Sequence, residues 1–332
     1  NCGNRVLMNK SIKIGVLGCS SFGMRSMVPT IKEMGNEFEL VAISSRRIEK
    51  AKKYAKIFDI QYTFDSYQQL IDLEGLDAVY IPLPNALHFQ WVKIAIEKSL
   101  HVLVEKPMAL TYDQVKYLND LALQNECVLV ENFHFRFHKQ LEFIQKAVND
   151  GIIGELRCVK SSFGFPPFVD KANIRYQKEL GGGSLFDAGV YPIKIVQLFL
   201  GGDIEVSAAN LDLDIETQID VWGGAYLKQK SGSLFAQISF GFDNFYQCNL
   251  ELWGSKGRIY ANRIFTAPPE LKTKIIIETL EDRQEYKMEA CNHFEKILTY
   301  FYQSINSEEK NLEEYAQNIN QARLVSEVMK NS

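Results

Sequence analysis

Short apolar runs alternate with helix-like stretches over the first 130 residues. The apolar, often β-branched runs are Ile12–Leu17, Phe38–Ile43, Asp77–Ile81, His101–Val104 and Cys127–Val130. Apolar residues recur at helical spacing between these runs, over 22–34, 49–58, 86–98 and 112–124. Strands separated by helices of roughly 10–15 residues indicate βαβ units, so we expect a parallel sheet with helices on both faces.

The pattern changes after an amphipathic stretch at 137–150. Many short strands then follow, several of them alternating polar with apolar residues, and turn signals such as Gly254-Ser255-Lys256-Gly257 separate them. Such strands indicate a mainly antiparallel sheet with one face toward solvent or a ligand. The expected strands are 155–165, 204–213, 218–228, 232–241, 245–253, 257–262, 272–279 and 283–288, and two helices at 292–306 and 311–330 close the chain.

The change of rhythm predicts two domains. A chain of 332 residues fits two domains of roughly 100–200 residues each. We place an α/β Rossmann domain at 8–130 and an α+β domain at 131–310, and we expect the helix 311–330 to pack back on the first domain. No stretch rich in Pro, Gly or Ser lies between them, so the junction near residue 130 is expected to be tight.

Charge and cysteine content exclude several classes of protein. The net charge is -4 with Lys and Arg spread along the chain, which argues against a nucleic-acid surface. The six cysteines are scattered without a C-x-x-C pair, which suits a reducing cytoplasm and predicts no metal site. Because no apolar run approaches ~18 residues, we expect no membrane span, and the first residues lack the apolar core of a secretory signal.

The segment 15–23, GVLGCSSFG, follows the first strand and opens a helix. That position suits a dinucleotide fingerprint, in which glycines let backbone N–H groups approach a pyrophosphate at a helix N-terminus. Ser20 replaces the usual middle glycine, and its hydroxyl can donate to a phosphate. The alternative is an ordinary strand-to-helix turn. The candidate cofactor residues here are Gly18, Ser20, Ser21 and Phe22.

The second strand ends without the acidic residue that usually binds the ribose of NAD. Ser45, Arg46 and Arg47 stand there instead. Guanidinium groups suit a 2′-phosphate, which predicts NADP(H) in preference to NAD(H). The alternative is an N-cap serine followed by a solvated basic turn.

Two further strand ends carry candidate residues. The first is YIPLPNALH at 80–88, where Pro82, Leu83, Asn85 and His88 are candidates for cofactor binding; in the alternative, Asn85 only caps the next helix. The second is VEKP at 104–107, which places Glu105 and Lys106 at the carboxyl end of a parallel strand. α/β folds bind ligands at that edge.

The glycine-rich segment 181–191, GGGSLFDAGVY, allows close approach of the backbone to a neighbour. Asp187 and Tyr191 are four residues apart and would share one face of a helix. Taken alone, the position of Tyr191 is more typical of a tyrosine packed in the hydrophobic core than of a catalytic residue. His134 and His138 have the same spacing, but no carboxylate or cysteine pattern accompanies them, so we expect no metal there.

Together, GVLGCSSFG, IPLPNALH, VEKPMAL and GGGSLFDAGVYPI resemble the Gfo/Idh/MocA oxidoreductase family over nearly the whole chain, from Lys13 to Ser326. The resemblance implies that the nicotinamide lies beside Lys106 and that the open sheet of the second domain covers the substrate. It also implies a homodimer or homotetramer joined through the outer face of that sheet.

Many sugar-alcohol dehydrogenases of this family have D-x-x-x-H where this chain has Asp187 and Tyr191. The D-x-x-x-Y form is similar to glucose-fructose oxidoreductase, dihydrodiol dehydrogenase and the deoxysugar 3-ketoreductases. We therefore expect Tyr191 to act as the acid, with its pKa lowered by Lys106, and Asp187 to orient a sugar hydroxyl or the lysine. Asn173, Arg175 and Tyr176 are candidates for substrate contact, and Arg175 suits either a sugar diphosphate or an ion pair between the domains.

The leading hypothesis is an NADP(H)-dependent reductase of a sugar ketone, in particular a nucleotide-linked one. Oxidation of a free sugar or a dihydrodiol would use the same residues and stays open as an alternative. A non-catalytic NADP-binding regulator is the third hypothesis, although such a protein could dispense with Lys106 or Tyr191, and both are present.

Overall fold

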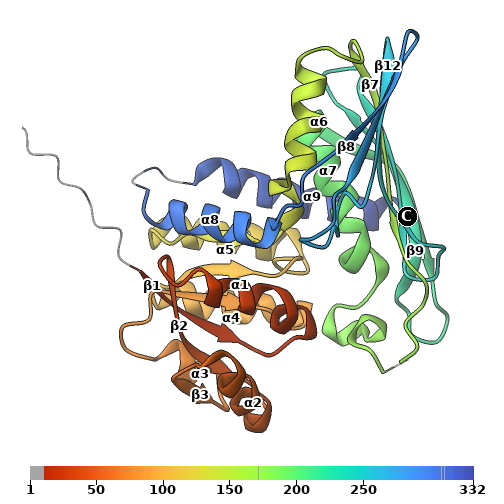
Figure 1. Cartoon of the computed structure of the whole chain (residues 1–332). Helices are drawn as coiled ribbons and strands as arrows, with labels where there is room; N and C mark the ends of the chain where they lie inside the picture. Colours follow the sequence, from red (N-terminus) through yellow and green to blue (C-terminus); the bar gives the residue numbers. More distant parts are fainter. Residues whose placement is uncertain (1–10, 171, 308, 310) are drawn as a thin grey trace, which may run out of the picture.

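The structure is a computed structural model that describes residues 11–170, 172–307, 309 and 311–332. Two sheets dominate it and stand at an angle to each other, with helices filling the space between them (Figure 1). Within the described residues, no helix is long and apolar enough to cross a membrane.

The first sheet has six strands, all parallel, in the order β3-β2-β1-β4-β5-β6. Buried strand residues such as Ile14, Val79 and Leu103 explain the continuous apolar runs, because helices cover both faces of the sheet. Its strands are β1 Ile12–Leu17, β2 Phe38–Ser44, β3 Tyr62–Phe64, β4 Ala78–Ile81, β5 His101–Val104 and β6 Leu129–Glu131.

The helices of this first half follow its strands. A five-residue π-helix, η1 (Gly23–Met27), precedes α1 because Pro29 has no N–H to continue the α-helical ladder. The remaining helices of this half are α1 Val28–Glu33, α2 Ile48–Phe58, α3 Tyr67–Ile71, α4 Asn85–Glu97 and α5 Tyr112–Gln124.

The second sheet has eight strands in the order β14-β13-β12-β11-β7-β10-β9-β8. Only β10 and β7 pair in parallel; the other pairs are antiparallel. Its strands are β7 Leu156–Gly164, β8 Ile204–Leu213, β9 Asp220–Gln229, β10 Phe235–Gly241, β11 Gln247–Gly254, β12 Gly257–Asn262, β13 Lys274–Thr279 and β14 Arg283–Lys287.

Helices cover one face of this sheet and leave the other uncovered (Figure 1). α6 (Lys139–Asn149) and α7 (Val190–Leu200) lie on the inner face, and Leu324, Val325 and Val328 of α9 (Leu312–Asn331) join the same core. Tyr315, nearer the start of α9, packs in the core of the first half and donates a hydrogen bond to the Cys127 carbonyl. α9 therefore touches both halves, while α8 (His293–Ile305) packs on the first sheet through Ile297 and Phe301.

The predicted fold class is confirmed: a parallel α/β half joined to a half with an open, mainly antiparallel sheet. The pattern missed β3 and α3, which are too short to show a period. It also missed the length of α7, whose residues are buried on almost every side and so show no amphipathic alternation. Short 3-10 turns, η2 (His134–Phe137), η3 (Ile174–Tyr176) and η4 (Lys178–Leu180), were likewise not predicted.

Candidate active site

A cleft of about 770 Å³ lies between the carboxyl edge of the first sheet and the inner side of the second half. Segments from both halves line it, which is the usual place for a ligand in such a fold. The residues predicted from sequence that line it are Ser20, Phe22, Pro82, Leu83, Asn85, Glu105, Lys106, Arg175, Asp187 and Tyr191.

The turn after β1 is built around Gly18. Its φ is 101°, and a Cβ there would lie 2.6 Å from a Leu83 methyl carbon, so only glycine fits. The Ser20 hydroxyl accepts a hydrogen bond from the Gly23 N–H at 3.0 Å and caps the following helix. That hydroxyl keeps its own proton for a further acceptor. Ser21 is exposed at the first turn of this helix.

The end of β2 presents two exposed arginines, Arg46 and Arg47, outside the lining of the main cleft. The Ser45 hydroxyl accepts from the Arg47 N–H at 3.3 Å, so the solvated basic turn of the alternative is present, but the N-cap of α2 is Arg47 and not a serine. Burial raises the pKa of Tyr67, and Arg46, which contacts the Tyr67 hydroxyl, acts in the opposite direction. Both guanidinium groups remain open to solvent at the strand edge where an adenosine 2′-phosphate is expected.

Asn85 does not cap α4. Pro84 is the N-cap, and the Asn85 amide donates instead to the Gly181 carbonyl at 2.8 Å, which ties the first half to the glycine-rich segment. Gly181 has a φ of 74°, and a Cβ there would lie 2.9 Å from the Asn85 Cβ. The three-glycine run therefore allows the two halves to meet closely at the cleft.

His88 is fully buried behind the wall of the cleft and does not line it. Its Nδ1 lies 2.7 Å from the Pro107 carbonyl and its Nε2 lies 2.8 Å from the Leu83 carbonyl. The expectation of a direct cofactor contact is therefore not met in this structure. His88 instead joins two loops, one carrying Leu83 and the other carrying Lys106.

Four charged residues form what we call the cleft cluster: Glu105, Lys106, Arg175 and Asp187. Lys106 Nζ donates to the Asp187 backbone carbonyl at 2.7 Å and lies 3.5 Å from its carboxylate Oδ1. Arg175 Nε donates to the other carboxylate oxygen at 2.7 Å. Asp187 thus orients the lysine, one of the two roles expected for it, and it also engages Arg175. Arg175 is therefore in an ion pair, but its partner Asp187 belongs to the same half, so the pair does not join the two domains as the alternative required.

Burial and neighbouring charges act against each other in this cluster. Burial lowers the pKa of Lys106, and Asp187 offsets part of that effect by stabilising the ammonium form, while Arg175 lowers it further. For Asp187, burial alone would raise the pKa, but Lys106 and Arg175 together bring it below the usual value. Glu105 accepts hydrogen bonds from Tyr80 at 2.6 Å and Asn132 at 2.5 Å, and burial raises its pKa.

Tyr191 lines the cleft and lies among four aromatic rings from three segments. Lys106 Nζ lies 4.8 Å from its ring centroid, over the ring face. The expectation that Lys106 lowers the phenol pKa is wrong: burial raises the pKa of Tyr191 well above its usual value, and the Glu105 and Asp187 charges add to the increase. The surrounding rings are Phe133, Phe135, Phe163 and Phe265.

Asn173 and Tyr176 do not line the cleft. The Asn173 side chain caps the short η3 turn by accepting from the Arg175 N–H at 3.1 Å. The Tyr176 hydroxyl accepts from the Phe168 N–H at 3.1 Å, and its ring packs on Phe242. In this structure both residues shape the loop that presents Arg175.

Several site residues were missed from sequence. Asp220 accepts from the Ser184 hydroxyl at 2.7 Å and the Leu185 N–H at 2.6 Å, which anchors the π-helix η5 (Leu185–Gly189) that carries Asp187. No local motif marks Asp220, because it acts across 36 residues. Gly181, Gly182 and Gly183, noted from sequence only for close backbone approach, and His134, considered only as a metal ligand, also line the cleft. The lining residues that the sequence did not single out are Arg25, Ser26, Phe163, Phe165, Ile174, Leu180, Arg263, Thr266, Ala267, Pro268, Pro269, His293 and Phe294.

Two family models match this chain. One, described as an oxidoreductase family with an NAD-binding Rossmann fold, matches residues 12–133, and the other, the GFO/IDH/MocA C-terminal domain, matches residues 141–260. The chain belongs to the GFO/IDH/MocA oxidoreductase family. The resemblance inferred from the motifs is thereby confirmed.

Similar proteins within the family include reductases and dehydrogenases. A dTDP-3,4-didehydro-2,6-dideoxy-alpha-D-glucose 3-reductase of Saccharopolyspora spinosa is 38% identical over 90% of this chain and 89% of its own length. A D-xylose 1-dehydrogenase (NADP(+)) of Haloferax volcanii is 31% identical over 83% of this chain and 86% of its own.

Among solved structures, a 3-ketoreductase from Actinomadura kijaniata in complex with NADP and TDP-benzene superposes with a TM-score of 0.93. It is 34% identical, and the match covers 97% of this chain and 98% of that one. The present chain therefore shares both halves and their arrangement with a protein whose solved structure contains a dinucleotide and a nucleotide analogue.

Proposed function

We propose that this GFO/IDH/MocA protein is an NADP(H)-dependent reductase of a nucleotide-linked keto sugar. The observation that carries the proposal is the pair Lys106 and Tyr191, which stand against each other on the wall of one cleft that also includes the turn after β1. A cation beside a phenol at a ligand-sized cleft suits the reduction of a carbonyl group.

The residues around the turn after β1 fit a dinucleotide. Gly18 permits close backbone approach, the Ser20 hydroxyl keeps a proton to donate, and the exposed Arg46 stands where a 2′-phosphate would need a cation. The remaining proposed cofactor contacts are Ser21, Phe22, Ser45, Arg47, Pro82, Leu83, Asn85 and Glu105, with His88 holding two of the loops from behind. When bound, NADPH supplies a hydride for the substrate's carbonyl carbon.

The chain's own residues complete the reduction. Negative charge develops on the substrate oxygen, and the Lys106 ammonium is held by Asp187 at a fixed place to stabilise it. The Tyr191 hydroxyl donates the proton that this oxygen needs. Burial raises the pKa of Tyr191, so the phenol is protonated near neutral pH and holds the proton that the alkoxide takes up.

The relatives favour a nucleotide-linked substrate. The Saccharopolyspora enzyme is named for a dTDP-linked sugar, and the Actinomadura structure contains TDP-benzene. The second candidate, oxidation of a free sugar, is favoured by the similarity to D-xylose 1-dehydrogenase. Both would use Lys106 and Tyr191, and they differ in direction and in the need for a nucleotide.

The open face of the second sheet is the proposed surface for a homodimer or homotetramer. Its outward side chains include Trp222, Tyr226 and Trp253, which are 43%, 37% and 55% exposed. Exposed aromatic residues gathered on one sheet face are typical of a protein interface. Light scattering should give a multiple of 38.0 kDa, and Trp253→Glu should lower that mass.

A cytoplasmic location is also proposed. Five cysteines of the described part of the chain are buried and unbridged, namely Cys19, Cys127, Cys158, Cys248 and Cys291, as suits a reducing compartment. Fractionation of cells that express the protein would test it.

Titration with NADPH and NADH tests the cofactor proposal first. We expect NADPH to bind at least tenfold more tightly, and Arg46→Ala to remove most of that preference, since one lost charge-assisted contact costs about 1.5–3 kcal/mol. Arg157→Ala, an exposed arginine on β7, is the matched control. Equal binding of the two cofactors, or a preference for NADH, would contradict the assignment.

Turnover of a substrate panel separates the two candidate activities. The NADPH-loaded enzyme should reduce the dTDP-linked 3-keto sugar named for the relatives faster than the free keto sugar. D-xylose and a dihydrodiol with NADP⁺ are the competing substrates. Faster oxidation of either would replace the proposed function with the second candidate, and binding of NADPH without turnover of any of them would favour a regulator.

A further inference from the structure

Behind the active site lies a second group of buried charges, which we call the rear cluster: Glu131, Arg136, Lys194 and Glu314. None lines the main cleft. Arg136 donates to both carboxylate oxygens of Glu314 at 3.0 Å, and the Tyr300 hydroxyl donates to the same carboxylate at 3.2 Å. That bidentate pair accounts for two of the four charges, and Glu131 and Lys194 remain.

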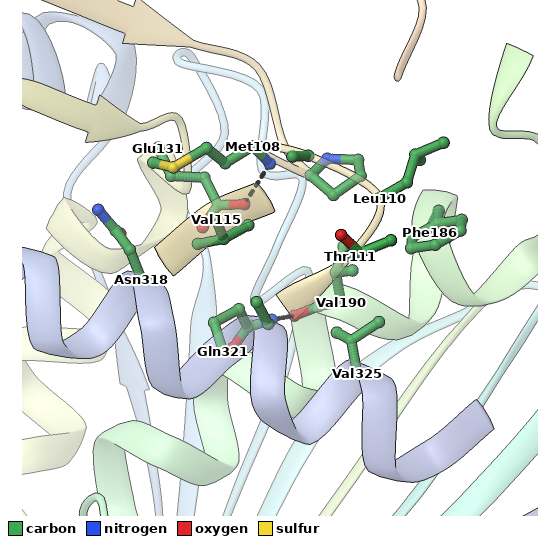
Figure 2. A pocket seen from close by; sticks show the side chains of 13 residues that line it. Met108, Leu110, Thr111, Val115, Glu131, Phe186, Val190, Asn318, Gln321 and Val325 are labelled. Carbon is green, nitrogen blue, oxygen red and sulfur yellow. Dashed lines mark hydrogen bonds between the residues drawn. The ribbon is translucent and has the colours of Figure 1, made fainter. Parts of the chain in front are cut away.

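Glu131 holds the loop that carries Lys106. It lies at the end of β6, it is 3% exposed, and its Oε1 accepts the Met108 backbone N–H at 2.8 Å (Figure 2). Met108 is two residues beyond Lys106. Pro107 stands between these two residues, and its carbonyl oxygen lies 2.7 Å from Nδ1 of His88. The position of the lysine loop is therefore set by two buried side chains that do not reach the cleft.

Lys194 lies on the helix that carries Tyr191. The two residues are three apart on α7, so they lie on neighbouring positions of one helix face. Lys194 is fully buried, its Nζ has no hydrogen-bond partner among the described residues, and it lies 5.5 Å from the Phe133 ring centroid. Burial and the nearby Arg136 guanidinium lower its pKa to about 8, and Glu314 and Glu131 offset part of that effect by stabilising the ammonium form.

The space between the lysine loop and α7 is nearly filled. A cavity of about 20 Å³ lies there, beside Met108, Glu131 and Val190, which is room for about one water molecule (Figure 2). α9 closes it through Gln321, whose amide donates at 2.8 Å to the carbonyl of Val190, the residue before Tyr191. A shift of either element would therefore be transmitted to the other by direct packing.

A buried lysine without a hydrogen bond is costly, and an apolar side chain of similar volume would ordinarily stabilise the core better. We propose that Glu131 and Lys194 are positioning residues for the reduction. Glu131 holds the loop of Lys106 through the Met108 N–H, and the Lys194 ammonium on the helix of Tyr191 lies over the ring of Phe133, two residues beyond Glu131. The two opposite buried charges thus hold the loop and the helix against one segment and fix the distance between the two groups that meet the substrate's carbonyl. This inference rests on the proposed function.

Single and double variants of the NADPH-loaded enzyme test it. Lys194→Met and Glu131→Gln should each slow hydride transfer in a single turnover of the dTDP-linked keto sugar by about 10- to 100-fold, since misplacement by about 1 Å has that effect. NADPH affinity should stay within about twofold of the wild-type value. The isotope effect of deuterated NADPH on steady-state kcat should increase, because hydride transfer becomes slower relative to product release. The double variant should be faster than either single one, because it leaves no lone buried charge.

Lys116→Met, an exposed lysine of α5 paired with Asp120, is the matched control and should leave the rate unchanged. Crystal structures of the NADP-bound variants give a readout that needs no turnover: the distance from Lys106 Nζ to the Tyr191 ring, which is 4.8 Å here. An unchanged distance and rate in both single variants would overturn the inference. Absence of turnover in the wild type alone would count against the proposed function, while the distance would still decide the positioning role.

Discussion

The cleft cluster and the rear cluster have the same composition: one lysine, one arginine and two carboxylates. In each, the arginine is paired directly with a carboxylate, Arg175 with Asp187 and Arg136 with Glu314. They differ in access to solvent. The Arg175 side chain is 38% exposed and lines the cleft, whereas the Arg136 side chain, on η2, is 9% exposed and lies against α9.

This difference indicates what each cluster can do. An ion pair at a cleft can exchange partners with a charged substrate at modest cost, because water already solvates part of it. A sealed pair cannot, since separating it leaves an uncompensated charge in a medium of low dielectric constant. The cleft cluster is therefore suited to chemistry, and the rear cluster is suited to holding the elements that carry that chemistry.

The largest expected effect is on activity, from changes at the cleft. Lys106→Met removes the ammonium, and Tyr191→Phe removes the donated proton, so each should lower kcat by about 100- to 10,000-fold. The free energy of unfolding should change little in Tyr191→Phe. Steady-state kinetics on the keto sugar, with sites counted by NADPH binding, provide the measurement.

Lys93→Met, an exposed lysine of α4, serves as the control for the lysine variant. Full activity in both Lys106→Met and Tyr191→Phe would show that the roles assigned to these residues are wrong.

The next effect is on stability, from a change in the rear cluster. Arg136→Met leaves the Glu314 carboxylate buried without its partner, which should lower the free energy of unfolding by about 3–5 kcal/mol. Arg175→Met, at the partly exposed pair, should cost about 1 kcal/mol or less. Urea unfolding of both variants at pH 7 measures the difference. Equal losses would mean that burial does not separate the two clusters.

The sequence predicted one wall of the cleft much better than the other. Ser20, Pro82 and Lys106 line this wall as expected, because each follows a strand of a regular βαβ pattern and the carboxyl ends of parallel strands meet at one edge. The contact of Lys106 with Asp187 spans 81 residues, and that of Arg136 with Glu314 spans 178. No local sequence pattern predicts contacts between residues so far apart, so the rear cluster was not predicted. Asp187 itself was identified through the D-x-x-x-Y pattern, without its contact to Lys106.

The pKa of Tyr191 was mispredicted for the same reason, because it depends on residues that are distant in the sequence. The motif placed a lysine near the phenol, and from that charge alone a lowered pKa follows. Phe133, Phe163 and Phe265 reach the same ring from three separate segments and bury it. Burial by these rings raises the pKa of the phenol more than a nearby positive charge could lower it. The extent of that burial depends on tertiary packing, which no local motif shows. The alternative weighed for Asn85, a local helix cap, is likewise wrong, because its partner Gly181 is 96 residues away.

The smallest expected effect is on the pH profile, and it distinguishes the two neighbours of Lys106 within the cleft cluster. Activity should fall at alkaline pH as the Lys106 ammonium loses its proton. Arg175 lowers the pKa of Lys106 and Asp187 raises it. The alkaline limb of kcat/KM should therefore move to higher pH in Arg175→Gln and to lower pH in Asp187→Asn, where the backbone carbonyl of residue 187 still holds the lysine. Lys93→Met should leave the limb in place, because that ammonium is not among the charges that act on Lys106. A limb at the same pH in all three variants would mean that a group other than Lys106 controls the alkaline loss.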